Sequence, residues 1–182
     1  HELREGKFHQ HFTVDMIQGG AGTSTNMNAN EVIANRALEI MGHKRGEYQY
    51  CHPNNHVNLS QSTNDTYPTA MKIAIYMSNE KLEQSVEELA RAFAEKAVEF
   101  RHVLKMGRTQ LQDAVPMTLG QEFQAYADML SGEVLRLRQA ADYFLEVNMG
   151  ATAIGTGINA VPGYAEKCVA HLARISGFDV KL

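Results

Sequence analysis

Two long stretches of the chain carry an apolar side chain every three or four residues, which is the repeat of an amphipathic helix. The first stripe consists of Leu82, Val86, Leu89, Phe93, Ala97 and Phe100. The second consists of Leu119, Phe123, Tyr126, Leu130, Val134, Leu137, Ala141 and Phe144. We therefore predict an all-α fold with two long antiparallel helices, over residues 66–100 and 118–147.

Local signals place the boundaries of these and other helices. Thr23 and Ser24 offer N-cap hydroxyls to a shorter helix that Gly42 would end. Thr118 and Gln121 have the spacing of a capping box at the start of the second long helix.

The remaining segments are shorter. Pro68 is expected in the first turn of the first long helix, because proline is tolerated there. A last helix is predicted over 165–176, ended by Gly177. Residues 13–17 are expected to be extended, and residues 108–116 to be irregular.

The length of the first long helix bears on how the chain assembles. A helix over residues 66–100 would be roughly 50 Å long. A compact globule of 182 residues would be only about 40 Å across. The apolar stripes therefore cannot be buried within this chain alone. We predict an elongated bundle with partner helices, from further sequence and from other subunits.

Composition argues against nucleic acid and membranes as partners. The hydrophobic share is 44% and the net charge is −4, so there is no basic footprint for nucleic acid or an anionic membrane. The longest apolar run, residues 71–77, is too short to span a bilayer. Cys51 and Cys168 make no disulfide framework, which favours a reducing, cytoplasmic setting.

Three polar segments at helix starts or boundaries are the candidates for chemistry: residues 20–24, 62–64 and 109–110. Helix N-termini expose N–H groups and attract anions, and hydroxyl or amide side chains there can donate to a carboxylate. Each segment taken alone also has a plainer interpretation, because Thr, Ser and Asn before a helix are commonly only caps.

Other site types find little support. The glycine-rich loop at 19–22 is not followed by the Gly-Lys-Ser/Thr of a phosphate-binding loop. His52 and His56 have a metal-ligand spacing beside Cys51, but nothing further completes a site, so no metal is expected. No paired-carboxylate or Ser/His/Asp pattern supplies a base, which places the base outside these residues.

Taken together, three motifs resemble the aspartase/fumarase superfamily over essentially the whole chain. They span Gly19–Ile33, Gln61–Thr69 and Gly107–Pro116. Within the superfamily, Gly-Ala-Gly-Thr-Ser at 20–24 and Ser-Thr-Asn at 62–64 are similar to aspartases rather than fumarases. Many relatives have His where this chain has Gln110, and a Gln side chain can only form hydrogen bonds.

The resemblance implies part of an L-aspartase-like fold. Residues 1–64 would end the N-terminal domain, and residues 65–182 would begin the central helical bundle. It also implies reversible deamination of L-aspartate to fumarate and ammonia, without a cofactor, in a homotetramer whose subunits share active sites. The family's base is a Ser on a Gly-Ser-Ser loop, expected beyond Leu182, so no catalytic residue is assigned here.

The family's substrate contacts map residue by residue onto this sequence. Those expected to surround the substrate are Thr23, Ser62, Thr63 and Asn64. Those expected at its other end are Thr109 and Gln110. Two alternatives stay open: a class II fumarase or another lyase of the superfamily, and a helical oligomerisation segment without chemistry. His52, Asn54 and Asn55 resemble a second anion site of fumarases, or form a plain loop.

Overall fold

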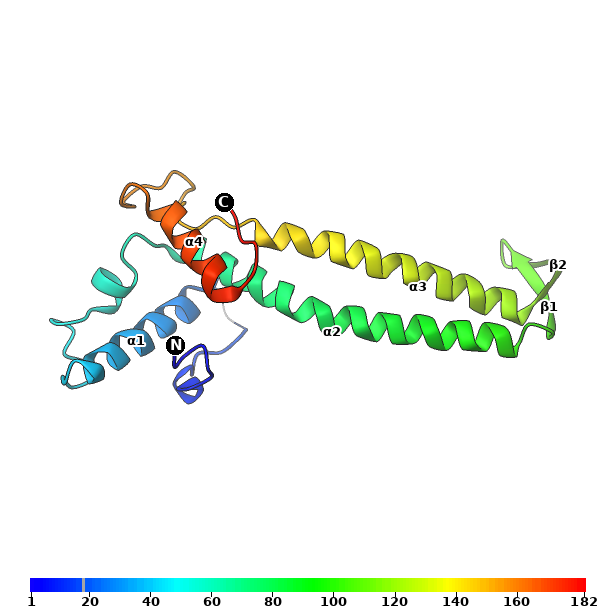
Figure 1. Ribbon diagram of the computed structural model, residues 1–182, viewed down its shortest axis with the longest axis horizontal. Helices are drawn as coiled ribbons and strands as arrows, with labels where there is room; N and C mark the ends of the chain where they lie inside the picture. Colours follow the sequence, from blue (N-terminus) through cyan, green and yellow to red (C-terminus); the bar gives the residue numbers. More distant parts are fainter. Residues whose placement is uncertain (18) are drawn as a thin grey trace. The chain divides into compact units, whose positions relative to one another are not determined.

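The computed structural model of the chain describes residues 1–17 and 19–182 and is mainly helical (Figure 1). Its long elements are α1 (Thr23–Ile40), α2 (Thr63–Glu99), α3 (Leu119–Asp142) and α4 (Tyr164–Ser176). The short helical turns are η1 (His9–His11), η2 (Pro53–Val57) and η3 (Tyr143–Leu145). The all-α prediction is confirmed, with one small antiparallel hairpin added by β1 (Leu104–Thr109) and β2 (Gln112–Thr118).

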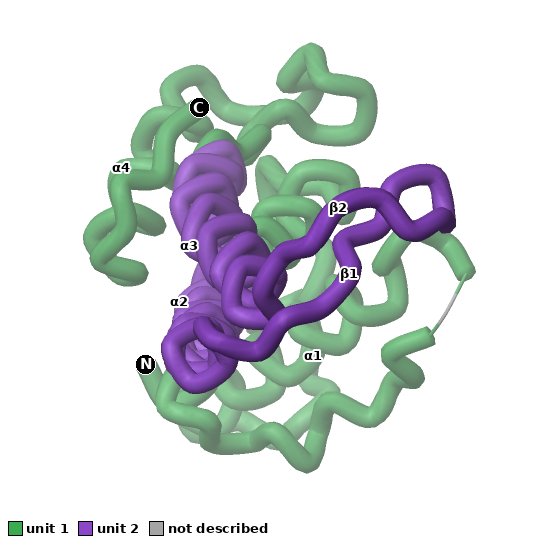
Figure 2. The backbone as a smooth tube through the Cα atoms, turned by 90° about the vertical axis from the view of Figure 1, so that its right-hand side faces the viewer, with its two compact units in different colours: residues 1–73, 145–182 green, residues 74–144 purple. Residues whose placement is uncertain are grey.

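The chain divides into two compact units, which Figure 2 colours separately. Unit 1 combines residues 1–73 with residues 145–182, and unit 2 consists of residues 74–144. These units describe packing within this chain. The domain boundary between residues 64 and 65 that we predict for the full-length protein is not tested by this packing and stays a prediction.

Aromatic side chains join α2 to α3 within unit 2, where the two helices run antiparallel (Figure 1). The Phe93 ring centroid lies 5.7 Å from that of Phe123 and 5.5 Å from that of Tyr126. Phe100 adds a further contact with Phe123 at 5.5 Å. Such tilted and edge-on pairs stabilise by about 0.5–1.5 kcal/mol each beyond the area they bury. The prediction of two long antiparallel helices is confirmed.

Polar and close backbone contacts complete the pairing at either end. The Arg138 guanidinium lies 2.7 Å from a Glu83 carboxylate oxygen and 2.6 Å from one of Glu87. At the opposite end the buried Gly120 donates its N–H to the Phe100 carbonyl. A Cβ on Gly120 would lie 2.4 Å from the Ala97 carbonyl oxygen, so this approach requires glycine.

Much of the apolar surface of unit 2 stays uncovered by the chain itself. Leu82 is 50% exposed, Leu89 48% and Leu135 59%. A helix stripe that packs only against one neighbouring helix buries only part of its width. Within the described residues, the stripes are therefore only partly buried, as the length argument predicts.

The prediction of an irregular segment over 108–116 is wrong. Residues 104–118 form a hairpin in which Leu104 pairs with Thr118 and Thr109 pairs with Gln112. Its two-residue turn holds Gln110 at φ 48° and Leu111 at φ 65°. Both angles lie in the left-handed region that two-residue hairpin turns require.

Three boundary predictions also need correction. Helix α2 begins at Thr63, so Pro68 is its sixth residue and lies beyond the first turn. The second long helix ends at Asp142, short of residue 147, because the chain tightens into the η3 turn. Residues 13–17 include no strand. By contrast, the capping box of Thr118 and the glycine end of α4 are confirmed.

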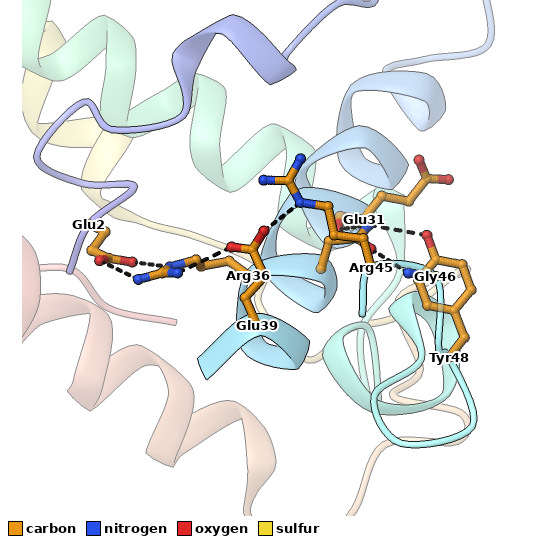
Figure 3. Close-up of polar contacts among 8 residues, drawn as sticks. Glu2, Glu31, Arg36, Glu39, Arg45, Gly46 and Tyr48 are labelled. Carbon is orange, nitrogen blue, oxygen red and sulfur yellow. Dashed lines mark hydrogen bonds and ion pairs between the residues drawn. The ribbon is translucent and has the colours of Figure 1, made fainter. Parts of the chain in front are cut away.

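In unit 1, ion pairs tie the N-terminal segment to α1 (Figure 3). The Arg36 guanidinium donates to both carboxylate oxygens of Glu2, at 2.6 and 2.8 Å, and to Glu39 at 3.1 Å. Arg45 and Arg36 hydrogen-bond to Glu39 and lower its pKa. Exposed pairs of this kind contribute little individually, so they fix the position of the segment more than they stabilise the fold.

Candidate functional site

The first predicted site residue, Thr23, opens α1 without capping it. The N-cap is the buried Gly22, at φ 86°, and no side chain accepts a hydrogen bond there. The Thr23 hydroxyl instead donates to the Gly20 carbonyl oxygen at 2.9 Å. The prediction that Thr23 and Ser24 act as N-caps is therefore wrong, and the exposed Thr23 side chain needs another explanation.

The starts of α1 and α2 lie against each other, which brings two of the predicted segments together. A Cβ on Gly22 would lie 2.3 Å from the Tyr67 ring, so the glycine makes room for that ring. The Asn26 side-chain amide donates to the Thr63 hydroxyl at 3.0 Å. The structure thus brings Thr23 and Thr63 into one region of unit 1.

A group of asparagines behind this contact was not identified from the sequence. The buried Asn26 and Asn30 both donate to the Asn58 side-chain oxygen, at 3.3 and 2.9 Å. Buried amides are stable only when hydrogen-bonded, so this network fixes the segment before α2 against α1. The signal in the sequence was two amides one helical turn apart on the buried face of α1.

The start of α2 has the reciprocal hydrogen bonds of a cap. The Ser62 hydroxyl accepts from the Asn64 N–H at 3.2 Å, and the Ser62 N–H donates to Asp65 Oδ1 at 3.0 Å. The capping interpretation is therefore correct for Ser62. Asp65 is fully buried and also accepts from the Thr66 hydroxyl at 3.0 Å. Asp65 was not singled out from the sequence.

The loop after α3 completes this region from 84 or more residues away along the chain. The Asn148 amide donates to the Asn64 carbonyl oxygen at 3.1 Å. The Asn64 amide donates in turn to the Ala153 carbonyl oxygen at 2.7 Å. The Thr152 N–H donates to Asp65 Oδ2 at 2.8 Å. The loop therefore contacts both the exposed and the buried side of the 62–65 turn.

An open polar cleft of about 470 Å³ adjoins this turn within unit 1. Its walls come from residues 54–62 and from residues 152–159. Close to this cleft, burial and a hydrogen bond to Cys168 raise the pKa of Tyr164 to about 12. The Tyr164 hydroxyl therefore keeps its proton at neutral pH and is not a base there.

The other two predicted site residues lie in unit 2. Thr109 ends β1, and Gln110 is the first residue of the hairpin turn. Their grouping with the residues of unit 1 remains a prediction. A left-handed conformation at a residue other than glycine costs free energy, and the two-residue hairpin turn accounts for it at Gln110.

The metal hypothesis for His52 and His56 has a structural alternative. Nδ1 of His52 accepts from the Asn54 and Asn55 N–H groups, and Nδ1 of His56 accepts from the His52 N–H at 2.8 Å. Both histidines thus hold the backbone of η2. Over residues 1–17 and 19–182, no three His, Cys, Asp or Glu side chains form a group that could hold a metal ion.

Among the helices that the structure describes, none is both long and apolar enough to cross a membrane.

Comparison with known proteins gives closely similar relatives over nearly all of the chain. A protein-family model described as Lyase matches residues 1–182. An aspartate ammonia-lyase of Pseudomonas aeruginosa is 63% identical over 180 residues, which are 98% of this chain and 38% of that protein. The aspartate ammonia-lyase of Bacillus subtilis is 59% identical over 98% of this chain and 38% of its own length. The chain thus spans less than two fifths of these relatives.

Solved structures agree with this comparison. A structure titled fumarate lyase:delta crystallin, from Brucella melitensis, is 54% identical with a TM-score of 0.90. The match covers 99% of this chain and 39% of that one. A class II fumarase from Schistosoma mansoni is 38% identical with a TM-score of 0.84, over 97% of this chain and 37% of that one.

Proposed function

Since the chain belongs to the lyase family whose model matches residues 1–182, we propose that the full-length protein is an aspartate ammonia-lyase. Its reaction is the reversible deamination of L-aspartate to fumarate and ammonia. The observation that carries the proposal is the identity of 63% and 59% to aspartate ammonia-lyases over almost every residue of this chain. The hydroxyl and amide side chains at the starts of α1 and α2, which are exposed or half-buried, suit a dicarboxylate substrate.

The chemistry requires donors where negative charge develops. Removal of the proton beside the side-chain carboxylate moves charge onto that carboxylate, and preorganised donors stabilise it. The Thr63 oxygen accepts from Asn26 and, among the described residues, the hydroxyl donates to none, which leaves its proton for a ligand. Ser62 is arranged in the same way, because its oxygen accepts from the Asn64 N–H.

Asn64 offers a different combination. One hydrogen of its amide is used by the Ala153 carbonyl, and because a carbonyl can only accept, this bond fixes which way the amide faces. The side-chain oxygen then remains to accept from a substrate ammonium group. Thr23, Ser62, Thr63 and Asn64 together would surround the substrate.

The remaining contacts depend on assembly. We propose that Thr109 and Gln110 reach the other end of the substrate in a cytoplasmic homotetramer with shared active sites. The partly exposed stripes of α2 and α3 support such an assembly, because large apolar patches rarely stay uncovered. The base is proposed to come from a Gly-Ser-Ser loop of the full-length protein.

Alanine substitutions in the full-length enzyme test the proposal. Thr23→Ala, Thr63→Ala and Asn64→Ala should each lower kcat/KM by about a hundredfold or more, because each removes a donor or acceptor at the substrate. Fumarate formation from aspartate is followed by ultraviolet absorbance. The matched control is Thr118→Ala, which removes the capping hydroxyl of α3 and should lower stability by about 1 kcal/mol.

Two outcomes would contradict the proposal. If the three site variants keep near wild-type kinetics and lose only as much stability as Thr118→Ala, these polar side chains have a structural role and not a catalytic one. If malate, and not aspartate, is converted to fumarate, the protein is a class II fumarase, which the likeness to the Schistosoma mansoni enzyme makes the second candidate.

A further inference from the structure

The loop over residues 148–153 contacts the start of α2 at three points, and the proposed chemistry uses only the one at the Asn64 side chain. Asn148 contacts the Asn64 backbone, Ala153 contacts the Asn64 side chain, and Thr152 contacts Asp65. All of these residues lie in unit 1. The loop therefore holds Asn64. Asn64 is itself a proposed substrate contact, and its N–H donates to the hydroxyl of another, Ser62.

The first contact exists because of Pro68. In an α-helix the N–H of residue 68 would donate to the carbonyl of residue 64, and proline has no N–H. The Asn64 carbonyl is left without its helical donor, and the Asn148 amide takes that place at 3.1 Å. A proline inside α2 thus opens a hydrogen-bonding position that Asn148, a residue from another segment, fills.

The contact between Thr152 and Asp65 is buried. The fully buried Asp65 carboxylate accepts the Ser62 N–H on one oxygen and the Thr152 N–H on the other. Thr152 is itself buried, with φ 60°, so its backbone is held in a conformation that L-residues rarely adopt. Such a conformation persists where surrounding contacts determine it, and the bond to Asp65 is one of them.

We propose that the 148–153 loop positions the 62–64 turn for catalysis, with Asn148 and Asp65 as positioning residues. The inference rests on the proposed function. The loop fixes the Asn64 backbone from one side and its amide orientation from the other, so the side-chain oxygen of Asn64 faces one direction. Residues that orient metal ligands typically change metal affinity or activity by ten- to hundredfold when altered, and we expect an effect of about that size for residues that orient Asn64.

The test uses the full-length enzyme with Asn148→Asp, which keeps the shape of the side chain and removes its donor. We expect kcat/KM to fall by about ten- to hundredfold, mainly through kcat, because the reacting geometry is disturbed. The matched control is Asn35→Asp elsewhere in unit 1, which removes the hydrogen bonds that the side-chain amide donates to the Glu31 carbonyl at 2.8 Å and to the Tyr48 hydroxyl at 3.2 Å. The control should keep kcat/KM within about twofold of wild type. Unchanged kcat/KM in Asn148→Asp would overturn the inference.

A second pair of variants tests whether Asn148 positions the turn or only supplies a hydrogen-bond donor to the Asn64 carbonyl. Pro68→Ala restores the missing N–H, so adding it to Asn148→Ala should recover the melting temperature through a helical hydrogen bond. It cannot restore the tether to the loop, so kcat/KM should stay low. Full recovery of kcat/KM by Pro68→Ala would show that Asn148 only satisfies the carbonyl, and would refute a positioning role.

Hydrogen exchange tests the loop independently of turnover. In the full-length protein, Asn148→Asp should speed exchange of the Thr152 N–H, which Asp65 accepts, while Asn35→Asp should not. Equal protection of Thr152 in wild type and Asn148→Asp would overturn the inference. A wild-type enzyme that does not deaminate aspartate would instead overturn the proposed function, and the exchange result would still decide whether the loop holds the turn.

Discussion

Replacing Gly22 by alanine should damage the site more than any other change of one methyl group at the start of α1. Gly22 combines φ 86° with direct contact to Tyr67, whose ring atoms would lie 2.3–2.5 Å from the new Cβ. Real Cβ atoms do not approach carbon this closely, so either the ring or the helix start must move. Because Tyr67 follows the Ser62–Asn64 turn on α2, the movement reaches the proposed substrate contacts.

The magnitude follows from two separate costs. A left-handed conformation costs an L-residue about 1–2 kcal/mol. Inserting a methyl group into a filled space costs a further ~1–3 kcal/mol. Gly22→Ala should therefore lower the free energy of unfolding by about 2–5 kcal/mol.

The control lies two residues away. Gly20 has nearly the same backbone angle, φ 85°, but no described atom within 4 Å of its ideal Cβ. Gly20→Ala should therefore cost only the conformational part, about 1–2 kcal/mol. Denaturant unfolding and kcat/KM of the full-length variants measure both effects. Adding Tyr67→Ala should reduce the extra cost of Gly22→Ala, because the clashing ring is removed.

Equal losses for Gly20→Ala and Gly22→Ala would refute this reasoning. In that case the backbone angle alone would explain both changes, and the packing of Tyr67 against the start of α1 would have no energetic importance. The same conclusion would follow if Tyr67→Ala and Gly22→Ala gave simply additive effects, because residues in contact should not.

Further predictions concern unit 2 and the chain as a whole. Gly120→Ala should lower the melting temperature of the full-length enzyme, because its Cβ would overlap the Ala97 carbonyl; an unchanged melting curve would contradict that packing. The 182-residue chain should self-associate through its exposed stripes, whereas sedimentation as a compact monomer at micromolar concentration would oppose this. The same chain should form no fumarate from aspartate, because donors cannot accept a carbon-bound proton; turnover abolished by Thr63→Ala would reveal a base within it.

The helices were predictable because their information is local. Apolar spacing of three and four residues identified α2 and α3, and the capping box at Thr118 fixed one boundary to the residue. The hairpin was missed because its turn carries Gln110 and Leu111 at positive φ. Sequence signals for such turns depend on glycine or asparagine, and neither is present.

Of the candidate site, the sequence indicates only the hydroxyl and amide side chains at the helix starts. Hydroxyls and amides at helix starts are visible in a sequence, and the structure places Thr23 beside the segment that carries Thr63. Asp65 and Asn148, which hold these side chains in place, could not be predicted, because they acquire their partners only in the folded chain. Long-range pairing of this kind leaves no periodic trace in the sequence.

The separation between Asp65 and Thr152 also has a consequence for synthesis on the ribosome. The two residues are 87 positions apart, and unit 1 cannot close until the whole of unit 2 has been made. At ~5–20 residues per second, Thr152 follows Asp65 by roughly 4–17 s. Throughout that interval the nascent chain carries a carboxylate that lacks its loop partner. Slower or faster translation of residues 74–144 would thus lengthen or shorten the time before Asp65, at the start of α2, can form its hydrogen bond with Thr152.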